Sequence, residues 1–348
     1  MKNFIVGLVA LFCSSTWAAC VNPVTLGAVD GAANNTVPLQ AAFNYGAANS
    51  VAVCIPVGTW KHTGLVGASN LRIAGEGKET ILLNTGSGTA IDFTGANNFS
   101  VSNLSLQGVA TVITATPYPT MTQTGTAIRV SGSYGFKISD LKISYVGTGI
   151  DYQANPSWGQ KGRFSDIDFS FVYKAVWTSN AGEYANFTNL QVDQSTFGVH
   201  VDSGNNIFTG VQVTRSGVGV KLSGGSNNGH GQFIGSTFNH DNYALDAYEA
   251  VSLGETFVGC HFVGDITNPG NAGRIRIYNS KGIAIIGGHI GANITIDGGS
   301  GTQIGPNMIA HALIRTELPG YVAPQVVNGG IGLFKDNFTL AGIFGGNN

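Results

Sequence analysis

A six-residue pattern of apolar and polar positions recurs along the middle of the chain. Each copy has the form apolar-x-small-apolar-x-apolar, and the frame holds even where Ser236 and Gly288 occupy the middle apolar position. Successive copies begin 37, 26, 23, 21, 25, 24 and 28 residues apart. The copies read VSNLSL (Val101), ISDLKI (Ile138), FSDIDF (Phe164), FTNLQV (Phe187), FTGVQV (Phe208), FIGSTF (Phe233), FVGCHF (Phe257) and IIGGHI (Ile285).

A second pattern lies between these copies and alternates with period two, as a strand with one buried face does. Its copies are GTAIDF (Gly88), GTAIRV (Gly125), GTGIDY (Gly147), YKAVWT (Tyr173), TFGVHV (Thr196), GVGVKL (Gly217), NYALDA (Asn242) and AGRIRI (Ala272). Each repeat therefore supplies at least two short strands. One repeat cannot bury its apolar face alone, so the pattern predicts an all-β solenoid with coils about 4.8 Å apart. A β-propeller is the alternative, but its blades need about 40–45 residues.

The composition supports many short strands joined by turns. Of 348 residues, 51 are glycine, and only 10% are charged. Helical proteins rarely have such a composition, whereas strands joined by glycine turns do. The net charge of −2 suggests no basic surface, so we expect neither nucleic acid nor an anionic membrane as a partner.

Residues 1–18 are typical of a secretory signal peptide. A positive Lys2 precedes a short apolar stretch, and small residues precede a cut after Ala18. The stretch is too short to span a membrane, and no other segment of the sequence could do so. We therefore expect a secreted or periplasmic protein without a membrane span. A lipoprotein anchored through Cys20 is the alternative, which Trp17 disfavours because it stands three places before that cysteine.

The stretch LGAVDGAANNTVPLQAAFNYGAANSVAVCIPVGTW, residues 26–60, resembles the start of the pectin-lyase-like right-handed parallel β-helices. That superfamily includes pectate lyases, polygalacturonases and phage tailspikes. Its members begin with a GAxGDGxxDDTxAIQxA helix, a strand and a PxGxY turn, and here Asn34 and Asn35 replace the two Asp. The resemblance covers roughly residues 22–300 and implies a right-handed parallel β-helix solenoid.

The resemblance also implies how the chain is divided. After the signal peptide, residues 19–50 would form an N-terminal segment with a short capping helix. Residues 51–304 would form the parallel β-helix, and residues 305–348 a C-terminal cap or tail that could mediate a trimer.

The N-terminal segment carries two further expectations. A helix from about Thr36 to Tyr45, capped by Asn35, would lay its apolar stripe over the open end of the solenoid. Because the segment would lie beside the first strand, Cys20 and Cys54 could form a disulfide in an oxidising compartment. Cys260 points inward in the repeat and is expected to be a buried thiol.

Stacked coils place equivalent residues in columns along the solenoid. In the second pattern the inward column is Ile91, Ile128, Ile150, Val176, Val199, Val220, Leu245 and Ile275. The next residue points outward and gives the column Asp92, Arg129, Asp151, Trp177, His200, Lys221, Asp246 and Arg276. Two residues earlier, alternation places a strip of small residues on the same outer face: Ala90, Ala127, Gly149, Ala175, Gly198, Gly219 and Ala244. Together they predict a shallow trough in which a long flat ligand approaches the backbone.

This outward column has two interpretations. Trp177, His200, Asp202, Lys221, Asp246 and Tyr248 cluster in consecutive coils. An exposed tryptophan is typical of a sugar-stacking surface, which favours a binding site. The alternative is that the charges only keep an exposed sheet soluble, as adjacent pairs worth little energy.

The first pattern supplies a competing outward face, which we rank second because its Gln and Thr residues are typical of solvated strands. Its column is Ser105, Lys142, Asp168, Gln191, Gln212, Thr237, His261 and His289, and shortly after it come Asp193, Arg215, Asn239, His240 and Asp241. A turn column of Asn103, Asp140, Asp166 and Asn189, then glycine in four coils, indicates a structural corner with positive φ. Two long insertions, residues 109–124 and 151–162, are expected to wall a binding face.

Hydrolysis of a glycosidic bond needs two carboxyl groups, about 6.5–9.5 Å apart when the configuration is inverted. Asp202 and Asp246 lie two coils apart, which is about 10 Å along the axis, and flexible side chains could close the gap. We therefore assign them as the catalytic acid and base, with His200 and Lys221 orienting or neutralising an acidic group. Elimination beside a uronic acid is the alternative chemistry, with His200 or Lys221 as the base. The expected substrate-binding residues are Trp177, Asp151, Tyr248 and Arg276.

Two functional classes follow from these residues. The first is an exported glycoside hydrolase or polysaccharide lyase that cleaves its substrate along the trough. The second is a glycan-binding, adhesive β-helix similar to a tailspike body. Gly229-His230-Gly231 resembles a polygalacturonase motif, but the paired Asp-Asp motif of those enzymes is missing, so their mechanism is not carried over. No two His stand at ligand spacing, and we expect neither a metal nor a cofactor.

Overall fold

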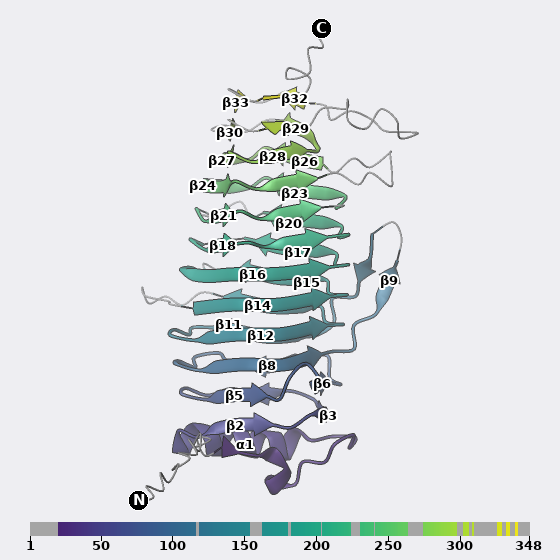
Figure 1. Cartoon of the computed structure of the whole chain (residues 1–348), viewed down its shortest axis with the longest axis vertical. Coiled ribbons are helices and arrows are strands. Elements are labelled where there is room, and N and C mark those ends of the chain that lie inside the picture. The colour runs from purple at the N-terminus through teal and green to yellow at the C-terminus, as the bar shows by residue number, and fades with distance from the viewer. Residues whose placement is uncertain are drawn as a thin grey trace, which may run out of the picture.

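The computed structural model describes residues 20–305, apart from 116–117, 154–161, 180–181, 203, 224–229, 240, 264–273 and 298–301. Beyond these it describes the short strands within residues 308–339. The expected signal peptide therefore lies outside the described residues. In the described part of the chain, strands stack one above another into a parallel β-solenoid, with the helix at its N-terminal end (Figure 1).

The larger of the two main sheets, sheet A, contains 21 strands in the described part of the chain. Its strands are β1 (Cys20–Val21), β2 (Ala52–Ile55), β3 (Gly58–His62), β5 (Arg72–Gly75), β6 (Thr80–Asn84), β8 (Ser100–Gln107), β12 (Lys137–Ser144), β14 (Gly162–Ser170), β16 (Ala185–Asp193), β18 (Ile207–Thr209), β19 (Gln212–Thr214), β21 (Gln232–Ile234), β22 (Thr237–Asn239), β24 (Val251–Val258), β25 (His261–Val263), β27 (Lys281–Ile286), β28 (His289–Gly291), β30 (Thr302–Ile304), β31 (Met308–Ile309), β33 (Gly332–Phe334) and β34 (Phe338–Thr339). These strands carry the first sequence pattern. The part of each coil that follows the corner residue is called here the second arm of sheet A.

The smaller sheet, sheet B, has 11 described strands and carries the second pattern. They are β4 (Leu65–Val66), β7 (Thr89–Asp92), β11 (Thr126–Ser131), β13 (Thr148–Gln153), β15 (Lys174–Ser179), β17 (Phe197–Val201), β20 (Val218–Leu222), β23 (Tyr243–Tyr248), β26 (Arg274–Tyr278), β29 (Asn293–Asp297) and β32 (Val326–Asn328). All of its pairings are parallel, and each member of the inward column is partnered with the next. The predicted repeat and its register are thus confirmed.

Five phenylalanines form one line through the interior, as the repeat predicts. Phe164, Phe187, Phe208, Phe233 and Phe257 are all buried. Their successive ring centroids are 4.5, 4.6, 4.5 and 4.8 Å apart, with the planes within 11° of parallel. Since each ring contacts the rings above and below, the line ties five coils into one core.

The predicted corner column is also confirmed. Asn103, Asp140, Asp166 and Asn189 have φ between 54° and 59°, and Gly210, Gly235, Gly259 and Gly287 follow with φ between 55° and 67°. Asn and Asp tolerate this left-handed region better than other side chains, and glycine carries no Cβ to hinder it. Asn189 donates to the Asp166 carboxylate at 2.7 Å, so neighbouring corners also bond to each other.

The strip of small residues lies inside the solenoid, and the prediction that it lines an outer trough is wrong. Ala90, Ala127, Ala175 and Ala244 are at most 1% exposed. A Cβ placed on Gly149 would come within 2.6 Å of the Phe169 ring, across the interior. The sheet B strands pair through the residues on either side of these positions, and there two consecutive residues are buried, so strict alternation fails. They are small because sheet B approaches the second arm of sheet A closely there.

Helix α1 (Thr36–Asn49) covers the N-terminal end and extends four residues beyond the predicted end at Tyr45. Its buried face consists of Leu39, Ala42, Phe43 and Gly46. Asn35 occupies the N-cap position, but its side chain bonds to the backbone of Val29 instead of capping the helix. The Asn34 carboxamide oxygen accepts the Thr36 N–H at 2.8 Å, so the neighbouring asparagine performs that role. A 3₁₀ helix, η1 (Pro23–Leu26), precedes it.

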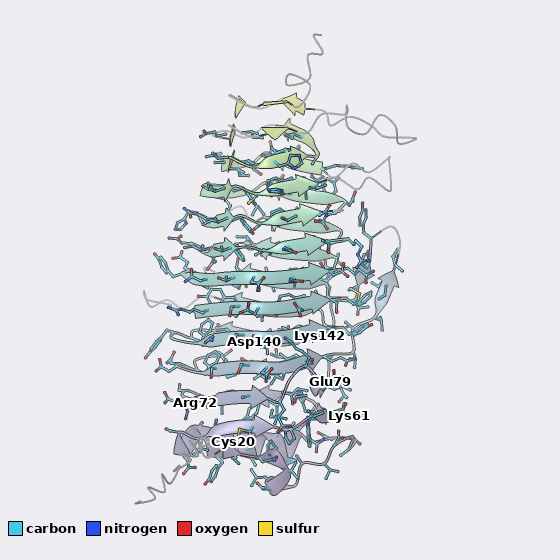
Figure 2. All side chains as sticks on the ribbon, viewed as in Figure 1. Cys20, Lys61, Arg72, Glu79, Asp140 and Lys142 are labelled. Carbon is cyan, nitrogen blue, oxygen red and sulfur yellow. A yellow bond between two sulfur atoms is a disulfide. The ribbon has the colours of Figure 1, made fainter. Side chains whose placement is uncertain are left out.

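A disulfide joins Cys20 to Cys54, with Cα atoms 5.8 Å apart. Cys20 lies in β1, which pairs in parallel with β2 (Figure 2). The bridge therefore holds the N-terminal segment against the first coil.

Replacing both bridged cysteines by Ser should lower the free energy of unfolding by about 3–4 kcal/mol, because the bridge closes a loop of 34 residues in the unfolded chain. Urea unfolding of the double variant beside the wild type, with and without reductant, measures this. A wild type whose stability is unchanged by reduction would contradict the prediction. Cys260→Ser provides the control for loss of a thiol that makes no bridge, since Cys260 is free and buried.

The described part of the insertion at residues 109–124 contains two paired strands beside the stack (Figure 1). Strands β9 (Val112–Thr114) and β10 (Thr120–Met121) are antiparallel. The Met121 N–H donates to the Thr196 hydroxyl at 2.9 Å, which ties the hairpin to a coil 75 residues further along. Of the second expected insertion, residues 151–162, residues 154–161 lie outside the described residues, while 151–153 belong to β13 and 162 begins β14. Within the described chain, we find no helix with the length and apolar character to cross a membrane.

Candidate functional site

The outward column of sheet B has the predicted register. Arg129 is partnered with Asp151, Trp177 with His200, Lys221 with Asp246 and Asp246 with Arg276. The candidate residues from the sequence are thus brought onto one face. What they contact decides whether they can act on a ligand.

Asp246 is held between two cations. One of its carboxylate oxygens accepts from Arg276 Nε at 2.6 Å, and the other from Lys221 Nζ and Arg276 Nη2, both at 2.8 Å. Burial alone would raise the pKa of Asp246, but the hydrogen bonds from Arg276 and Lys221 hold that pKa below its ordinary value. A carboxylate fixed in this way is a counter-ion rather than a proton donor.

Asp202 is fixed by a second network. It accepts from Trp177 Nε1 at 2.6 Å and from the Ser223 hydroxyl at 2.6 Å, and His200 Nε2 lies 3.0 Å away. Burial acts to raise the pKa of Asp202, yet these bonds lower it to about 2. Burial also lowers the pKa of His200, so its ring is neutral at pH 7.

Trp177 and Asp151 are also occupied by their neighbours. The Lys174 ammonium lies 3.8 Å from the centre of the Trp177 ring, so the side chain that covers this ring is a lysine of the same strand. Asp151 is buried and accepts from Arg129 Nε at 3.0 Å and from Gln153 Nε2. Asp151 therefore offers no open surface to a substrate, and Lys174 takes up part of the surface of the half-buried Trp177.

Asp202 and Asp246 belong to separate networks, and no contact joins their side chains among the described residues. Closing the gap between them would require these hydrogen bonds to break, so their pairing as acid and base stays a prediction. The paired charges match the alternative interpretation from the sequence, in which this face is stabilised by its own ion pairs. Tyr248 and Arg276 are the candidate residues of this face that stay substantially exposed.

The second arm of sheet A contains a hollow of about 300 Å³, on the face that we ranked second. Its lining comes from four coils and is mostly polar: Lys142, Asp168, Phe169, Ser170, Gln191, Val192, Asp193, Gln212 and Thr214. Figure 2 marks Lys142 on β12, two residues after the corner residue Asp140. Because Phe169 also packs inward against sheet B, the hollow and the outward face of sheet B point to opposite sides of the solenoid.

Two carboxyl groups share this hollow. Asp193 is the register partner of Ser170, and Asp168 stands two residues before Ser170 on the same face. A strand spacing of about 4.8 Å and a rise of about 3.3 Å per residue put their Cβ atoms about 8 Å apart. The carboxyl groups of inverting glycosidases are about 6.5–9.5 Å apart, a spacing that side chains with Cβ atoms about 8 Å apart can reach.

The two carboxyl groups have different surroundings. Asp193 accepts from Arg215 Nε at 2.9 Å, from a second guanidinium nitrogen of Arg215, and from the Thr214 hydroxyl at 3.1 Å. Asp168 is exposed and is the register partner of Lys142. Burial lowers the pKa of nearby Lys78, and the charge of Asp168 acts against that shift.

An aromatic pair follows the second arm of sheet A and is not part of the lining of the hollow. Tyr145 and Phe171 follow the second-arm residues Ser144 and Ser170, and their rings stack 5.4 Å apart. Both residues have positive φ, 54° and 52°, which is unusual for bulky side chains. The hairpin insertion begins beside them, because the Ala110 N–H donates to the Tyr145 carbonyl.

Asp241 lies inside the solenoid and not on the face where the sequence placed it. It is fully buried, and its Oδ1 accepts the Ser216 N–H at 2.8 Å. Oδ2 has no hydrogen-bond partner among the described residues. Its neighbour His240 lies outside them, as do Trp158 and Gly229.

Asp241→Asn should make the protein more stable at neutral pH. Burial raises the pKa of Asp241 well above its ordinary value, and the nearby Asp193 adds to this. The unfolded chain releases this proton near pH 4 while the folded chain keeps it, so folding loses stability as the pH rises above about 4. The variant should exceed the wild type in free energy of unfolding by an amount that grows by up to about 1.4 kcal/mol for each pH unit above about pH 4. This difference should vanish below about pH 3.5. Urea unfolding of both proteins from pH 3 to 8 measures it; a constant difference would refute it.

No family model and no curated protein sequence matches this chain. Solved structures do. The mannuronan C-5 epimerase AlgE6 A-module of Azotobacter vinelandii is similar with a TM-score of 0.58 and 12% identity, over 91% of this chain and 98% of that one. The tailspike of E. coli bacteriophage HK620, solved with a pentasaccharide, has a TM-score of 0.63 and 11% identity, over 92% and 66%. The catalytic unit of a GH87 α-1,3-glucanase from Streptomyces thermodiastaticus has a TM-score of 0.52 and 14% identity, over 92% and 70%.

These likenesses define the class of fold. All three neighbours are right-handed parallel β-helices, so the resemblance inferred from residues 26–60 is confirmed at the level of the fold. The identities are too low to transfer an activity, and one fold of this kind carries several chemistries. The function must be argued from the residues of this chain.

Proposed function

We propose that this protein binds a polysaccharide in the hollow of sheet A and hydrolyses it, with Asp168 and Asp193 as the carboxyl pair. The observation that carries the proposal is the polar hollow itself, which holds two carboxyl groups on one face at a suitable spacing. The named activities of the structural neighbours, which include a glucanase and a tailspike bound to a pentasaccharide, agree with a glycan ligand.

The two carboxyl groups would have separate roles. Asp193, which accepts two hydrogen bonds from Arg215, would act as the carboxylate that takes a proton from the attacking water. The water oxygen would bond to the anomeric carbon as the glycosidic C–O bond breaks. Asp168 would give its proton to the departing sugar oxygen. This sequence inverts the configuration at the anomeric carbon.

The remaining lining would hold the sugar chain. Ser170, Gln191, Gln212 and Thr214 supply donors and acceptors for hydroxyl groups along the axis of the solenoid. Lys142 adds a positive charge at the end of the hollow that lies nearer the N-terminus. The expected signal peptide and the disulfide both agree with action outside the cytoplasm.

Binding without cleavage is the second candidate function. The observation that favours it is the bonding of both Asp193 oxygens to Arg215, which leaves little room for an attacking water. In that case the hollow would be the glycan contact of an adhesive β-helix, and a homotrimer, as in the tailspike interpretation, would be its expected assembly.

A panel of neutral and uronic-acid polysaccharides incubated with the purified protein tests the proposal. We expect new reducing ends without unsaturated products, and NMR of the first products should show the inverted anomer. Unsaturated products would indicate elimination and contradict the hydrolytic pair. Glycan binding without any new reducing ends would establish the second candidate instead.

A further inference from the structure

Two histidines lie on neighbouring strands of the second arm of sheet A, beyond the hollow. His261 belongs to β25 and His289 to β28, and the two residues are register partners in parallel strands. Their ring centres are 5.7 Å apart, with the planes at 69° to each other. They are called here the histidine pair. In the sequence a whole coil separates them, so the short spacings typical of metal-binding histidines do not reveal the pair, and only the stacking of the coils brings it together.

The fold holds both imidazole rings on the outer surface. His261 is exposed and His289 is half-buried, while the residues that follow them, Phe262 and Ile290, are buried in the core. The His289 N–H donates to the Cys260 carbonyl at 3.0 Å, so a backbone hydrogen bond joins the two strands beside the rings. The separation of the two side chains is therefore set by the spacing of the strands.

This separation suits two imidazoles that share one metal ion. A metal ion lies about 2.1 Å from an imidazole nitrogen, and hence about 3.2 Å from the centre of that ring. Two rings on a tetrahedral ion therefore have centres about 5.2 Å apart. The observed 5.7 Å is close to this value, and rotation of the exposed His261 side chain can turn a ring nitrogen toward the ion. Neighbouring strands thus supply two ligands for one ion.

The ligand type favours a divalent transition metal. Imidazole nitrogen binds Zn²⁺, Ni²⁺ and Cu²⁺, whereas Ca²⁺ and Mg²⁺ prefer oxygen ligands. Thr237, the register partner of His261 in the preceding coil, adds a hydroxyl group to the same outward column. In the part of the chain that the structure describes, no group of three or more His, Cys, Asp or Glu could hold a metal ion, so water completes the coordination at this pair.

The histidine pair lies where the stacking of aromatic rings in the core gives way to aliphatic packing. Phe257, the last residue of the phenylalanine line, is the register partner of Ile285 in the following coil. Phe262, whose ring stacks on that of Phe238, is likewise the register partner of Ile290. A metal ion on the histidine pair joins the same two coils from the outside, at the junction where ring stacking no longer joins them inside.

We propose that His261 and His289 bind a divalent transition-metal ion, which links the coil of β24 and β25 to the coil of β27 and β28. The ion stabilises the folded chain, because the unfolded chain does not hold the two imidazoles together. This site goes beyond the proposed hydrolysis and does not depend on it, since neither histidine lines the hollow.

Titration calorimetry with Zn²⁺ tests the site on the purified protein, prepared without a polyhistidine tag. We expect one Zn²⁺ ion to bind per chain, and Ca²⁺ at the same concentration to give no heat of binding. His261→Gln and His289→Gln should each weaken zinc binding at least 10-fold, because a single imidazole cannot chelate the ion. His230→Gln is the matched control and should leave the affinity within about 2-fold, since His230 is also half-buried but precedes β21 and lies outside this column.

Thermal unfolding tests the link between the coils. Zinc at 100 times its dissociation constant should raise the midpoint of the wild type by about 3 °C. The same zinc concentration should raise the midpoint of His261→Gln by at most half as much. Lowering the pH from 7.5 to 5.5 should weaken zinc binding at least 10-fold, because protons compete with the metal for the imidazole nitrogens.

Several results would overturn the assignment. Absence of zinc binding, or unchanged affinity in both variants of the pair, would exclude it as a metal site. A loss in only one of these variants would contradict shared coordination, and an equal loss in His230→Gln would place the ion elsewhere. Zinc binding without a rise in the midpoint would remove the link between the coils. If His289→Gln fails to fold, His261→Gln decides alone, since its exposed ring can be replaced without disturbing the core.

Discussion

Asp168→Asn is expected to lower polysaccharide turnover at least 100-fold while the thermal midpoint stays within about 2 °C of the wild type. Loss of a general acid commonly costs about 10²–10⁴ in rate, and Asn keeps the volume of Asp while it cannot donate the acidic proton. Asp168 is exposed, so the exchange should disturb no core packing. Initial rates of reducing-end release, measured beside thermal unfolding, give both quantities.

Asp140→Asn is the matched control for this prediction. Asp140 is also an exposed aspartate, two residues before Lys142, but it stands at the corner and does not line the hollow. Its positive φ of 56° suits Asn as well as Asp. Full activity in Asp168→Asn would remove the hollow from the mechanism. If Asp202→Asn and Asp246→Asn then abolished turnover, the catalytic face would be that of sheet B.

Phe208→Ala is expected to lower the free energy of unfolding by about 3–5 kcal/mol. The Phe208 ring is fully buried between Phe187 and Phe233, with centroids 4.6 and 4.5 Å away. Its removal leaves a cavity in the middle of the line, and the neighbouring coils cannot close it because their strands are hydrogen-bonded at a fixed spacing. Equilibrium unfolding in urea measures the loss.

The neighbouring residue gives the comparison for this change. Ile207 precedes Phe208 in β18 but points outward and is 38% exposed. Ile207→Ala should therefore cost under about 1 kcal/mol, as changes at exposed positions usually do. A loss below 1 kcal/mol for Phe208→Ala as well would mean that the line of rings contributes little to the stability of the core.

Much of the fold could be predicted because the repeat tests each inference several times. From one stretch of alternating residues, neither the strand nor its buried face can be assigned with certainty. Eight copies with the same inward position leave few alternative assignments. The positive-φ corner was predictable for the same reason, since Asn, Asp and Gly succeed one another at one position. The strip of small residues was misplaced because strict alternation fails at its positions in the sheet B strands, where two consecutive residues are buried.

The candidate site was less predictable, because it depends on contacts between side chains of different coils. The column of sheet B was found from its charges and aromatic residues, but residue types alone do not show that Asp246 is shared by Lys221 and Arg276. The sequence analysis considered this outward face but did not predict that it contains a hollow. Asp168, Gln191 and Gln212 look like solvated strand residues in the sequence, and only their packing leaves a space between them. Their shared outward column was the one available signal.

The charged column of sheet B affects which strands of successive coils pair with each other. The line of phenylalanines cannot distinguish one coil from the next, because Phe187 could stack on Phe233 as readily as on Phe208. The charges can. If β13 paired with β7 and left β11 out, Asp151 would face Asp92, and if β26 paired with β20 and left β23 out, Arg276 would face Lys221. Either omission sets like charges side by side, which opposes strand pairing. The alternation of positive and negative charge thus disfavours pairing between strands of non-consecutive coils. A chain of similar repeats can therefore stack in sequence without skipping a coil.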